Sequence, residues 1–324
     1  MLLSIIIPAY NCADTLEKAV SSAVFFDNAE IIIVDDGSTD TTPDVIKNLA
    51  DRYGSIRTVR QTNSGPAKAR NTGIDIACGD YIMFIDSDDT FDKSAHSRIV
   101  SSLHTGTDIL IFGFRQCFYG RAEDKIYSVN SPFTVDEYYR RNLLNQVWNK
   151  AYRREFLNDS NIRFKDYRYG EDRIFNAEAL SCKPVINTIP DVLYNYNIDK
   201  SVSLISGYIP EKFDACKIIN SHFSRLCESK SVADYMFLKN VLSCMTVLFA
   251  DNCKLTNKEK KAEIRRIIND EAVKESFSNK QDSAANEIIR KIIASRNTAL
   301  NYLLAFSVSF CQKHLLSVFL KFRK

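Results

Sequence analysis

Three aspartates, Asp86, Asp88 and Asp89, follow directly after an apolar run at residues 81–85. Carboxylates this close together repel one another, so a positively charged partner is expected beside them. Asp86 and Asp88 are two positions apart, and in extended backbone their side chains point to the same side. Mg²⁺ and Mn²⁺ bind one or two carboxylates and complete their coordination with water and substrate phosphates. The pattern therefore fits a divalent cation that is shared with a phosphate-bearing ligand.

A structural interpretation of these residues stays open. Asp-x-Asp triplets arise often by chance, and the segment at 87–90, Ser-Asp-Asp-Thr, also suits the start of a helix. A second acidic segment at 35–38, Asp-Asp-Gly-Ser, equally suits a turn followed by a helix cap. The functional interpretation gains weight because both segments follow apolar runs, in order along the chain.

These apolar runs alternate with segments of helical pattern. We expect buried strands at 2–10, 30–34, 56–60 and 81–85, and helices at 16–25, 41–54 and 65–79. Asp14 and Glu17 are expected to form a capping box at the first helix. Strands that alternate with helices predict parallel βαβ units in an α/β sheet. Because ligands bind at the carboxyl ends of parallel strands, both acidic segments should meet at one edge of the sheet.

The pattern is less regular after the fourth strand. We expect a strand at 108–114, a loop or edge hairpin near 119–132, helices at 134–145 and 171–181, and short strands at 185–189 and 192–197. From about residue 208 the pattern is almost entirely helical, with no glycine after Gly207 and no proline after Pro210. We therefore expect an α/β domain at 1–205 and a helical C-terminal region at 206–324.

The composition excludes several classes of protein. The 324 residues carry 43 basic and 40 acidic side chains, a net charge of +3, so nucleic-acid binding is not expected. The nine cysteines show no C-x-x-C spacing and their number is odd, which argues against a zinc ribbon and a disulfide framework. The N-terminal run lacks the basic start and cleavage site of a signal peptide, and no segment has about 18 uninterrupted apolar residues. We expect a cytoplasmic protein with reduced thiols.

Five segments, in this order and spacing, resemble the successive signatures of the inverting glycosyltransferases of family 2: SIIIPAYN, EIIIVDDGSTD, NSGPAKARNTGI, GDYIMFIDSDD and YGEDRIF. The resemblance covers about residues 1–205. It implies the GT-A fold, a Rossmann-like and mainly parallel mixed sheet flanked by helices. It also implies transfer of a hexose or N-acetylhexosamine from a nucleotide-sugar, most often a UDP-sugar, to a glycan or lipid-linked saccharide acceptor. Bacterial polysaccharide and cell-envelope synthesis is the setting that the resemblance suggests.

The resemblance implies a nucleoside pocket at the first two strand ends. Pro8 and Tyr10 would line it, with Tyr10 against the base. Asp36 would accept a hydrogen bond from the base, and Asp35 would support Asp36. Without the resemblance, Tyr10 is equally well an ordinary half-buried aromatic residue.

The resemblance also assigns the acidic segment that follows the fourth strand. Asp88 would be the direct ligand of Mn²⁺ or Mg²⁺, and Asp86 would contact the ribose, or the metal through water. Asp89 would orient the acceptor or cap the next helix. Arg70 or Lys68 would lie near the nucleotide, although Lys68 also suits an exposed helix surface. The metal would stabilise the departing diphosphate as the glycosidic bond breaks.

Asp172 in YGEDRIF matches the general base of the family. A carboxylate on the face opposite the leaving group takes the proton of the attacking hydroxyl. Glu171 would bind the acceptor or raise the pKa of Asp172 by its like charge. Both residues also suit the first turn of the helix that follows, where the helix dipole favours acidic side chains.

The segment VWNKAYRREFL resembles the part of the family that lies near the acceptor. Trp148, the only tryptophan, would stack on a sugar ring or pack in the core. Lys150 would help to neutralise the diphosphate. The segment 194–203 resembles the lid region, in which relatives carry a His or Arg. This chain has Lys200 there, so a third metal ligand is not assigned.

The C-terminal segment 298–324 is strongly apolar and ends in three basic residues, Lys321, Arg323 and Lys324. It fits an amphipathic helix at the inner face of the cell membrane, which would suit a lipid-linked acceptor. It fits equally well a helix packed in the core or in the interface of a homo-oligomer.

Other classes of protein fit less well. A non-catalytic scaffold that binds nucleotide-sugars would not need the intact Asp-x-Asp and Glu-Asp segments. A sugar nucleotidylyltransferase needs a glycine-rich basic loop after the first strand, and PAYNCADTLEKA has neither glycine nor arginine. A dinucleotide oxidoreductase needs G-x-G-x-x-G at that place.

Overall fold

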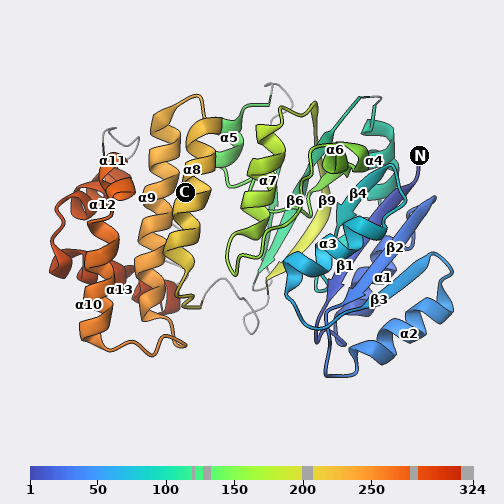
Figure 1. Cartoon of the computed structure of the whole chain (residues 1–324), viewed down its shortest axis with the longest axis horizontal. Coiled ribbons are helices and arrows are strands. Elements are labelled where there is room, and N and C mark those ends of the chain that lie inside the picture. Colours follow the sequence, from blue (N-terminus) through green and yellow to red (C-terminus); the bar gives the residue numbers. More distant parts are fainter. Residues whose placement is uncertain (105, 119–120, 127–132, 199–206, 278–283, 315–324) are drawn as a thin grey trace. The chain divides into compact units, whose positions relative to one another are not determined.

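A computed structural model describes the chain except for residues 105, 119–120, 127–132, 199–206, 278–283 and 315–324 (Figure 1). The chain forms two compact units. The first unit comprises residues 1–134, 143–167 and 171–201, and the second comprises 135–142, 168–170 and 202–324. The domain boundary expected at residues 205 and 206 lies at the edge of 199–206, outside the described residues.

The N-terminal half of the first unit is a parallel sheet, as the alternation of strands and helices predicts (Figure 1). Its strands lie in the order β3-β2-β1-β4 and are parallel throughout. Helices α1, α2 and α3 follow β1, β2 and β3 in turn and supply the crossover connections that parallel strands need. The bounds are β1 Leu3–Ala9, α1 Leu16–Ala23, β2 Ala29–Asp35, α2 Thr42–Arg52, β3 Ile56–Arg60, α3 Pro66–Ile76 and β4 Tyr81–Phe84.

Strand β1 lies in the middle of this parallel set. Leu3, Ile5, Ile6 and Ile7 are fully buried, as expected for a strand that is covered on both faces. Ala9 of β1 is paired with Asp35 of β2, so the carboxyl ends of the two strands are level. Asp35, which ends β2, and Asp36, which follows it, therefore lie next to the residues that follow β1.

The rest of the sheet is mixed. Strand β8 runs antiparallel to β4 and to β6, β9 runs parallel to β6, and β5 and β7 complete the sheet at β9 and β6. The two short strands expected at 185–189 and 192–197 are one strand, β9, whose pairing with β6 shifts register beside Gly113. Strand β8 was not expected, because its four residues begin with a lysine. The bounds are β5 Thr90–Phe91, α4 Ala95–Ser102, β6 Ile109–Phe118, β7 Arg121–Lys125, β8 Lys150–Arg153, α6 Arg154–Asp159, α7 Glu171–Ser181 and β9 Ile186–Ile198.

Two local predictions are wrong. The capping box expected from Asp14 and Glu17 is not formed: Thr15 is the N-cap of α1, and its side chain makes no capping hydrogen bond. The helix expected at 134–145 is only α5, Val135–Arg140, and the chain leaves helical geometry at Asn142, which has a positive φ of 59°. Asparagine tolerates this left-handed conformation better than most residues, so it ends the helical region.

The second unit is helical, as expected. Its core cluster is built around α9, where Phe237, Val241 and Met245 are fully buried. The segment Lys230–Phe249 is long and apolar enough to cross a membrane by length and composition, but 72% of it is buried inside the protein. Its apolar character is therefore accounted for by its place in the core. The bounds are α8 Lys212–Leu226, α9 Lys230–Thr246, η1 Val247–Phe249, α10 Asn257–Ile268, α11 Glu271–Glu275, α12 Ala284–Ala294 and α13 Thr298–His314.

Candidate active site

The carboxylate of Asp36 lies directly after β2 and is enclosed by the loop that precedes α3. It accepts hydrogen bonds from Gln61 Nε2 at 2.8 Å, from the backbone N–H of Ser64 at 2.9 Å and from that of Gly65 at 2.8 Å. Gly65 has a φ of 89°, a conformation that glycine adopts at low cost. These donors hold the start of α3 against the end of β2.

The neighbouring residues link the ends of β1 and β2. Asp35 accepts a hydrogen bond from the N–H of Ser38 at 2.8 Å and forms an ion pair with Arg60 at 3.4 Å. The Ser38 hydroxyl accepts a hydrogen bond from the N–H of Asn11 at 3.1 Å, just after β1. Tyr10, at the same end of β1, is 49% exposed.

The structure thus brings the predicted nucleoside residues to one edge of the sheet. Pro8 of β1 is paired with Val34 of β2, and Tyr10 follows one residue after β1 ends. The ring of Tyr10 is available to a flat ligand, while Asp35 and Asp36 are buried. Their roles toward a nucleoside stay predictions.

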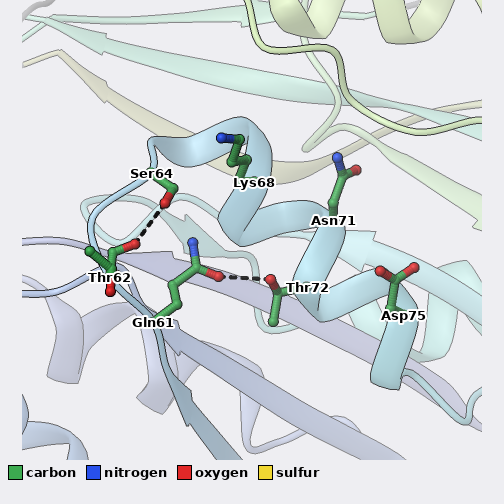
Figure 2. Close-up of a pocket in the computed structure, with 7 residues that line it drawn as sticks. All are labelled: Gln61, Thr62, Ser64, Lys68, Asn71, Thr72 and Asp75. Carbon is green, nitrogen blue, oxygen red and sulfur yellow. Dashed lines mark hydrogen bonds between the residues drawn. The ribbon is translucent and has the colours of Figure 1, made fainter.

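A shallow depression lies beside this loop, on the outer surface of α3 (Figure 2). Gln61 joins it to the buried edge, because Gln61 donates to Asp36 and accepts from the Thr72 hydroxyl at 2.7 Å. Lys68 lines the depression and forms an exposed ion pair with Asp166 at 3.5 Å. Sequence reasoning missed Gln61, which lies two residues before the matched segment NSGPAKARNTGI, and Thr72, which lies within that segment.

Arg70 of α3 is the central cation of the site. It is only 5% exposed, and its Nη2 donates to Asp86 Oδ1 at 2.9 Å. Its Nη1 donates to Asp172 Oδ1 at 3.1 Å and lies 3.6 Å from Glu171 Oε1. The guanidinium also lies over the ring of Phe164, at 5.4 Å from the ring centre. One buried arginine therefore joins the acidic segment after β4 to the first turn of α7.

This cluster controls the charge of Asp172. Burial lowers the pKa of Arg70, but the carboxylates of Asp172, Asp86 and Glu171 raise it further, so the guanidinium stays charged. Burial raises the pKa of Asp172 to about 7, and Glu171 and Asp86 act in the same direction, against Arg70 and Lys150. A carboxylate with a pKa near neutrality is suited to take a proton during catalysis.

The other two aspartates of the acidic segment differ in environment. Asp88 is exposed as a residue, yet partial shielding of its carboxyl group and the charge of Asp86 raise its pKa. Asp89 is fully buried and accepts hydrogen bonds from the Tyr194 hydroxyl at 2.8 Å and the N–H of Asn197 at 2.7 Å. The Tyr194 hydroxyl also accepts from the N–H of Asp86 at 3.1 Å. Strand β9 therefore holds the acidic segment in place.

Asp86 and Asp88 are the carboxylates of this site that could bind a cation. Among the described residues, no group of three or more His, Cys, Asp and Glu side chains is arranged as a metal site. Asp86 and Asp88 form a pair of hard oxygen donors, and burial together with the charge of Asp86 raises the pKa of Asp88. Such a pair fits Mg²⁺ or Mn²⁺ if water and a diphosphate supply the remaining ligands.

Trp148 and Lys150 both lie in the interior. The Trp148 ring stacks on Tyr194 at 4.3 Å and on Tyr196 at 5.2 Å, and is 5% exposed. Lys150 Nζ donates to the carbonyls of Leu143 at 3.3 Å and Gln146 at 2.5 Å. Burial lowers the pKa of Lys150 to about 7, against the opposing charge of Asp172. The expected roles of Trp148 toward a sugar ring and of Lys150 toward the diphosphate stay predictions.

Of the remaining predicted residues, the structure describes Glu171 but not Lys200. Glu171 begins α7 beside Asp172, and 21% of its side chain is exposed. Lys200 lies outside the described residues. Sequence reasoning missed Tyr194 and Asn197, because their contacts with Asp89 form only when β9 pairs across the sheet.

Comparisons with known proteins agree with this arrangement. The sequence model described as Glycosyl transferase family 2 matches residues 4–161. The uncharacterized glycosyltransferase EpsJ of Bacillus subtilis is 27% identical over 301 residues, which cover 85% of this chain and 86% of EpsJ.

Two solved structures resemble the whole chain. The structure of S. aureus TarS 1–349 in complex with UDP-GlcNAc matches with a TM-score of 0.68 at 19% identity, over 97% of this chain and 92% of TarS 1–349. The mannosyltransferase PcManGT from Pyrobaculum calidifontis, in complex with GDP-Man and Mn²⁺, matches with a TM-score of 0.53 at 16% identity, over 96% of this chain and 88% of PcManGT. These likenesses show the GT-A fold.

Proposed function

Because this chain is a glycosyltransferase of family 2, with the family match over residues 4–161, we propose that it transfers a sugar from a nucleotide diphosphate sugar with inversion. The donor is a UDP-linked hexose or N-acetylhexosamine, and the acceptor is a hydroxyl of a glycan or lipid-linked saccharide. The observation that carries this proposal is the position of Arg70 between Asp86 and Asp172. It joins the residues proposed for the diphosphate side to the residue proposed as base.

The nucleoside is proposed to bind at the carboxyl ends of β1 and β2. The exposed ring of Tyr10 offers a flat apolar face to a base, and Pro8 borders it. Asp36 keeps its position through the loop before α3, so its carboxylate is oriented before a ligand arrives. The UDP-GlcNAc complex of TarS supports the choice of a UDP-linked donor.

Asp86 and Asp88 are proposed to hold a divalent cation together with the donor diphosphate. When bound, Mg²⁺ or Mn²⁺ would offset the negative charge of the departing diphosphate. The Mn²⁺ in the PcManGT complex supports this proposal. Among the described residues the Nε of Arg70 is buried and has no hydrogen-bond partner.

Asp172 is proposed as the general base. An Oδ atom of Asp172 takes the proton of the acceptor hydroxyl while the hydroxyl oxygen forms a bond to the anomeric carbon of the donor sugar. The bond between that carbon and the diphosphate oxygen breaks with its electron pair on the diphosphate. Arg70 orients the base through its hydrogen bond, and the pKa of about 7 lets Asp172 accept and later release the proton.

We assign the transfer reaction to the expected domain at 1–205. We assign contacts with the acceptor, a membrane or another subunit to the helical region at 206–324. We propose a cytoplasmic location, in line with the odd number and scattered spacing of the cysteines.

Binding and transfer together test the proposed function. The chain is titrated with UDP-, GDP- and dTDP-sugars, with and without Mn²⁺, and the melting temperature is recorded, since a ligand stabilises the state that it binds. We expect a rise with at least one UDP-sugar that depends on the metal. Asp172→Asn should keep this rise and lose transfer. Sugar transfer by the Asp172→Asn variant would exclude Asp172 as the base. If no nucleotide-sugar raises the melting temperature of the wild type, donor binding is contradicted.

A further inference from the structure

Helix α13, Thr298–His314, turns its small and polar residues toward the second unit. Asn301, Ala305 and Ser309, spaced four residues apart, are 0%, 0% and 6% exposed. The Asn301 side chain donates to the carbonyl of Ile292 at 2.9 Å, and Ala305 joins the apolar core of the second unit. A helix that packs only to fill a core would instead turn its largest apolar residues inward.

The large apolar residues of α13 lie on its outer face. Leu300, Leu303, Phe306 and Phe310 are 42%, 59%, 48% and 47% exposed. Their spacing of three and four residues places them along one face of the helix, and we call this set the α13 stripe. A continuous exposed apolar surface of this kind marks a site of interaction.

Lysines border the α13 stripe on the side of α10. Lys260 Nζ lies over the ring of Phe249 at 5.1 Å, and this ring contacts Phe306 of the stripe at 5.5 Å. Lys261 Nζ lies over the ring of Tyr302 at 5.5 Å. Both lysines thus project beside the apolar surface rather than away from it.

The C-terminal segment is basic in sequence. Lys313 of α13 forms an ion pair with Asp251 at 2.5 Å and is not counted toward this charge. In the sequence, residues 298–324 contain no Asp or Glu, and the basic residues Lys321, Arg323 and Lys324 follow the helix. An apolar stripe with a cationic border has the chemistry of a helix that lies at the surface of an anionic lipid bilayer.

We propose that the α13 stripe docks the chain on an anionic membrane surface. The stripe enters the boundary between headgroups and acyl chains, and Lys260 and Lys261 contact the lipid phosphates. Pairing with a second copy of the chain is disfavoured, because it would bring two cationic borders close together. The inference adds to the proposed function without depending on it, since membrane binding needs neither donor nor acceptor.

Vesicle sedimentation of the full chain tests this inference. We expect the protein to sediment with vesicles of phosphatidylcholine and phosphatidylglycerol, and not with phosphatidylcholine alone. The double substitution Leu303→Glu with Phe306→Glu should lower the bound-to-free ratio at least about tenfold, because burial of the two side chains in lipid is lost. Phe25→Glu is the matched control: Phe25 is 70% exposed in the first unit, and its substitution should leave binding unchanged.

Hydrogen exchange gives a second readout that needs no variant. Vesicles with phosphatidylglycerol should slow exchange in peptides from 298–314 and leave those from 16–23 unchanged. The inference is overturned if wild type does not sediment, or if the double variant binds as well as wild type. It is also overturned if light scattering shows that the wild type is a dimer and the double variant is a monomer. A lower melting temperature of the double variant would show that the chain itself covers the α13 stripe. This result would also overturn the inference.

Discussion

Arg70 Nη1 lies 3.1 Å from Asp172 Oδ1, inside a cluster that holds three carboxylates around one buried guanidinium. The resemblance to family 2 suggested that Arg70 lies near the nucleotide, and the structure places its Nη atoms on Asp86, Glu171 and Asp172. A buried cation in this position keeps the base ionised at a lower pH than burial alone would allow. It also fixes the direction in which the base points.

The rate of transfer should depend on the protonation of Asp172. Its raised pKa of about 7 means that the base is largely protonated at pH 5 to 6 and becomes active as pH rises through neutrality. We expect kcat/KM to rise with pH along a limb centred near 7 in the free enzyme. Initial rates at constant ionic strength from pH 5 to 9 measure this limb. A rate that is flat across this range would contradict the assignment.

Replacing Arg70 by methionine should move that limb to higher pH. The substitution removes a charge that lowers the pKa of Asp172, so a larger share of the base is protonated at pH 7. We expect kcat at pH 7 to fall at least about tenfold and to recover partly at pH 9. Arg70→Lys keeps the positive charge, so its kcat at pH 7 should fall less than that of Arg70→Met. A limb unchanged in Arg70→Met would show that Arg70 does not act on the base.

The control for Arg70→Met is Arg52→Met. Arg52 forms an exposed ion pair with Glu17 at 2.8 Å, away from the acidic segment, and its loss should change neither kcat nor the pH profile.

Asp88 should matter for donor binding that depends on metal. Asp88 and Asp86 are the two carboxylates proposed to bind the cation, and Asp88→Ala removes the more exposed of them. We expect the rise in melting temperature with UDP-sugar and Mn²⁺ to disappear, because the diphosphate would lose its counter-charge. Asp51→Ala removes an exposed carboxylate of α2 that pairs with Lys47, and should keep the rise. Donor binding by Asp88→Ala as tight as wild type would argue against a metal ligand at this position.

Lys150 should stabilise the segment that precedes β8. Lys150→Met fills similar space but removes the lysine donor from the carbonyls of Leu143 and Gln146, of which Gln146 keeps its hydrogen bond from Asn176 at 3.0 Å. We expect the free energy of unfolding of the first unit to fall by about 1 to 3 kcal/mol. Urea denaturation followed by the fluorescence of Trp148, the only tryptophan, reports this unit. Lys47→Met, at an exposed position, should change the midpoint little, and an equal change in both variants would contradict the role of Lys150.

The start of α10 provides a test in the second unit. Thr256 and Glu259 form a complete capping box, so Thr256→Ala should lower the free energy of unfolding by about 0.5 to 2 kcal/mol. Thr41→Ala is the matched control, because Thr41 is the N-cap of α2 and its side chain makes no capping hydrogen bond. Thermal unfolding monitored by circular dichroism measures both. A cap without energetic value would leave the two variants alike.

The local pattern of the sequence was enough to predict the parallel half of the sheet and α7. Each of these elements is specified by its own residues: continuous apolar runs in β1, β2 and β4, and helical periodicity between them. The same runs predicted that Asp35, Asp36, Asp86, Asp88 and Asp89 follow strand ends. The capping box at Asp14 failed because several polar residues near a helix start can serve as the cap, and the local sequence does not decide which one does.

Only the tertiary structure decided which of these groups meet. Asp89 is held by Tyr194 and Asn197, and Arg70 lies between Asp86 and Asp172, because α3, α7 and β9 pack around the end of β4. The burial of Lys150 was not predicted from the sequence, and the sequence left open whether the apolar residues of 298–324 face outward or pack inside. A residue's type and its near neighbours set the conformation of its own segment. Its charge state and partners depend on groups that are distant along the chain and become neighbours only on folding.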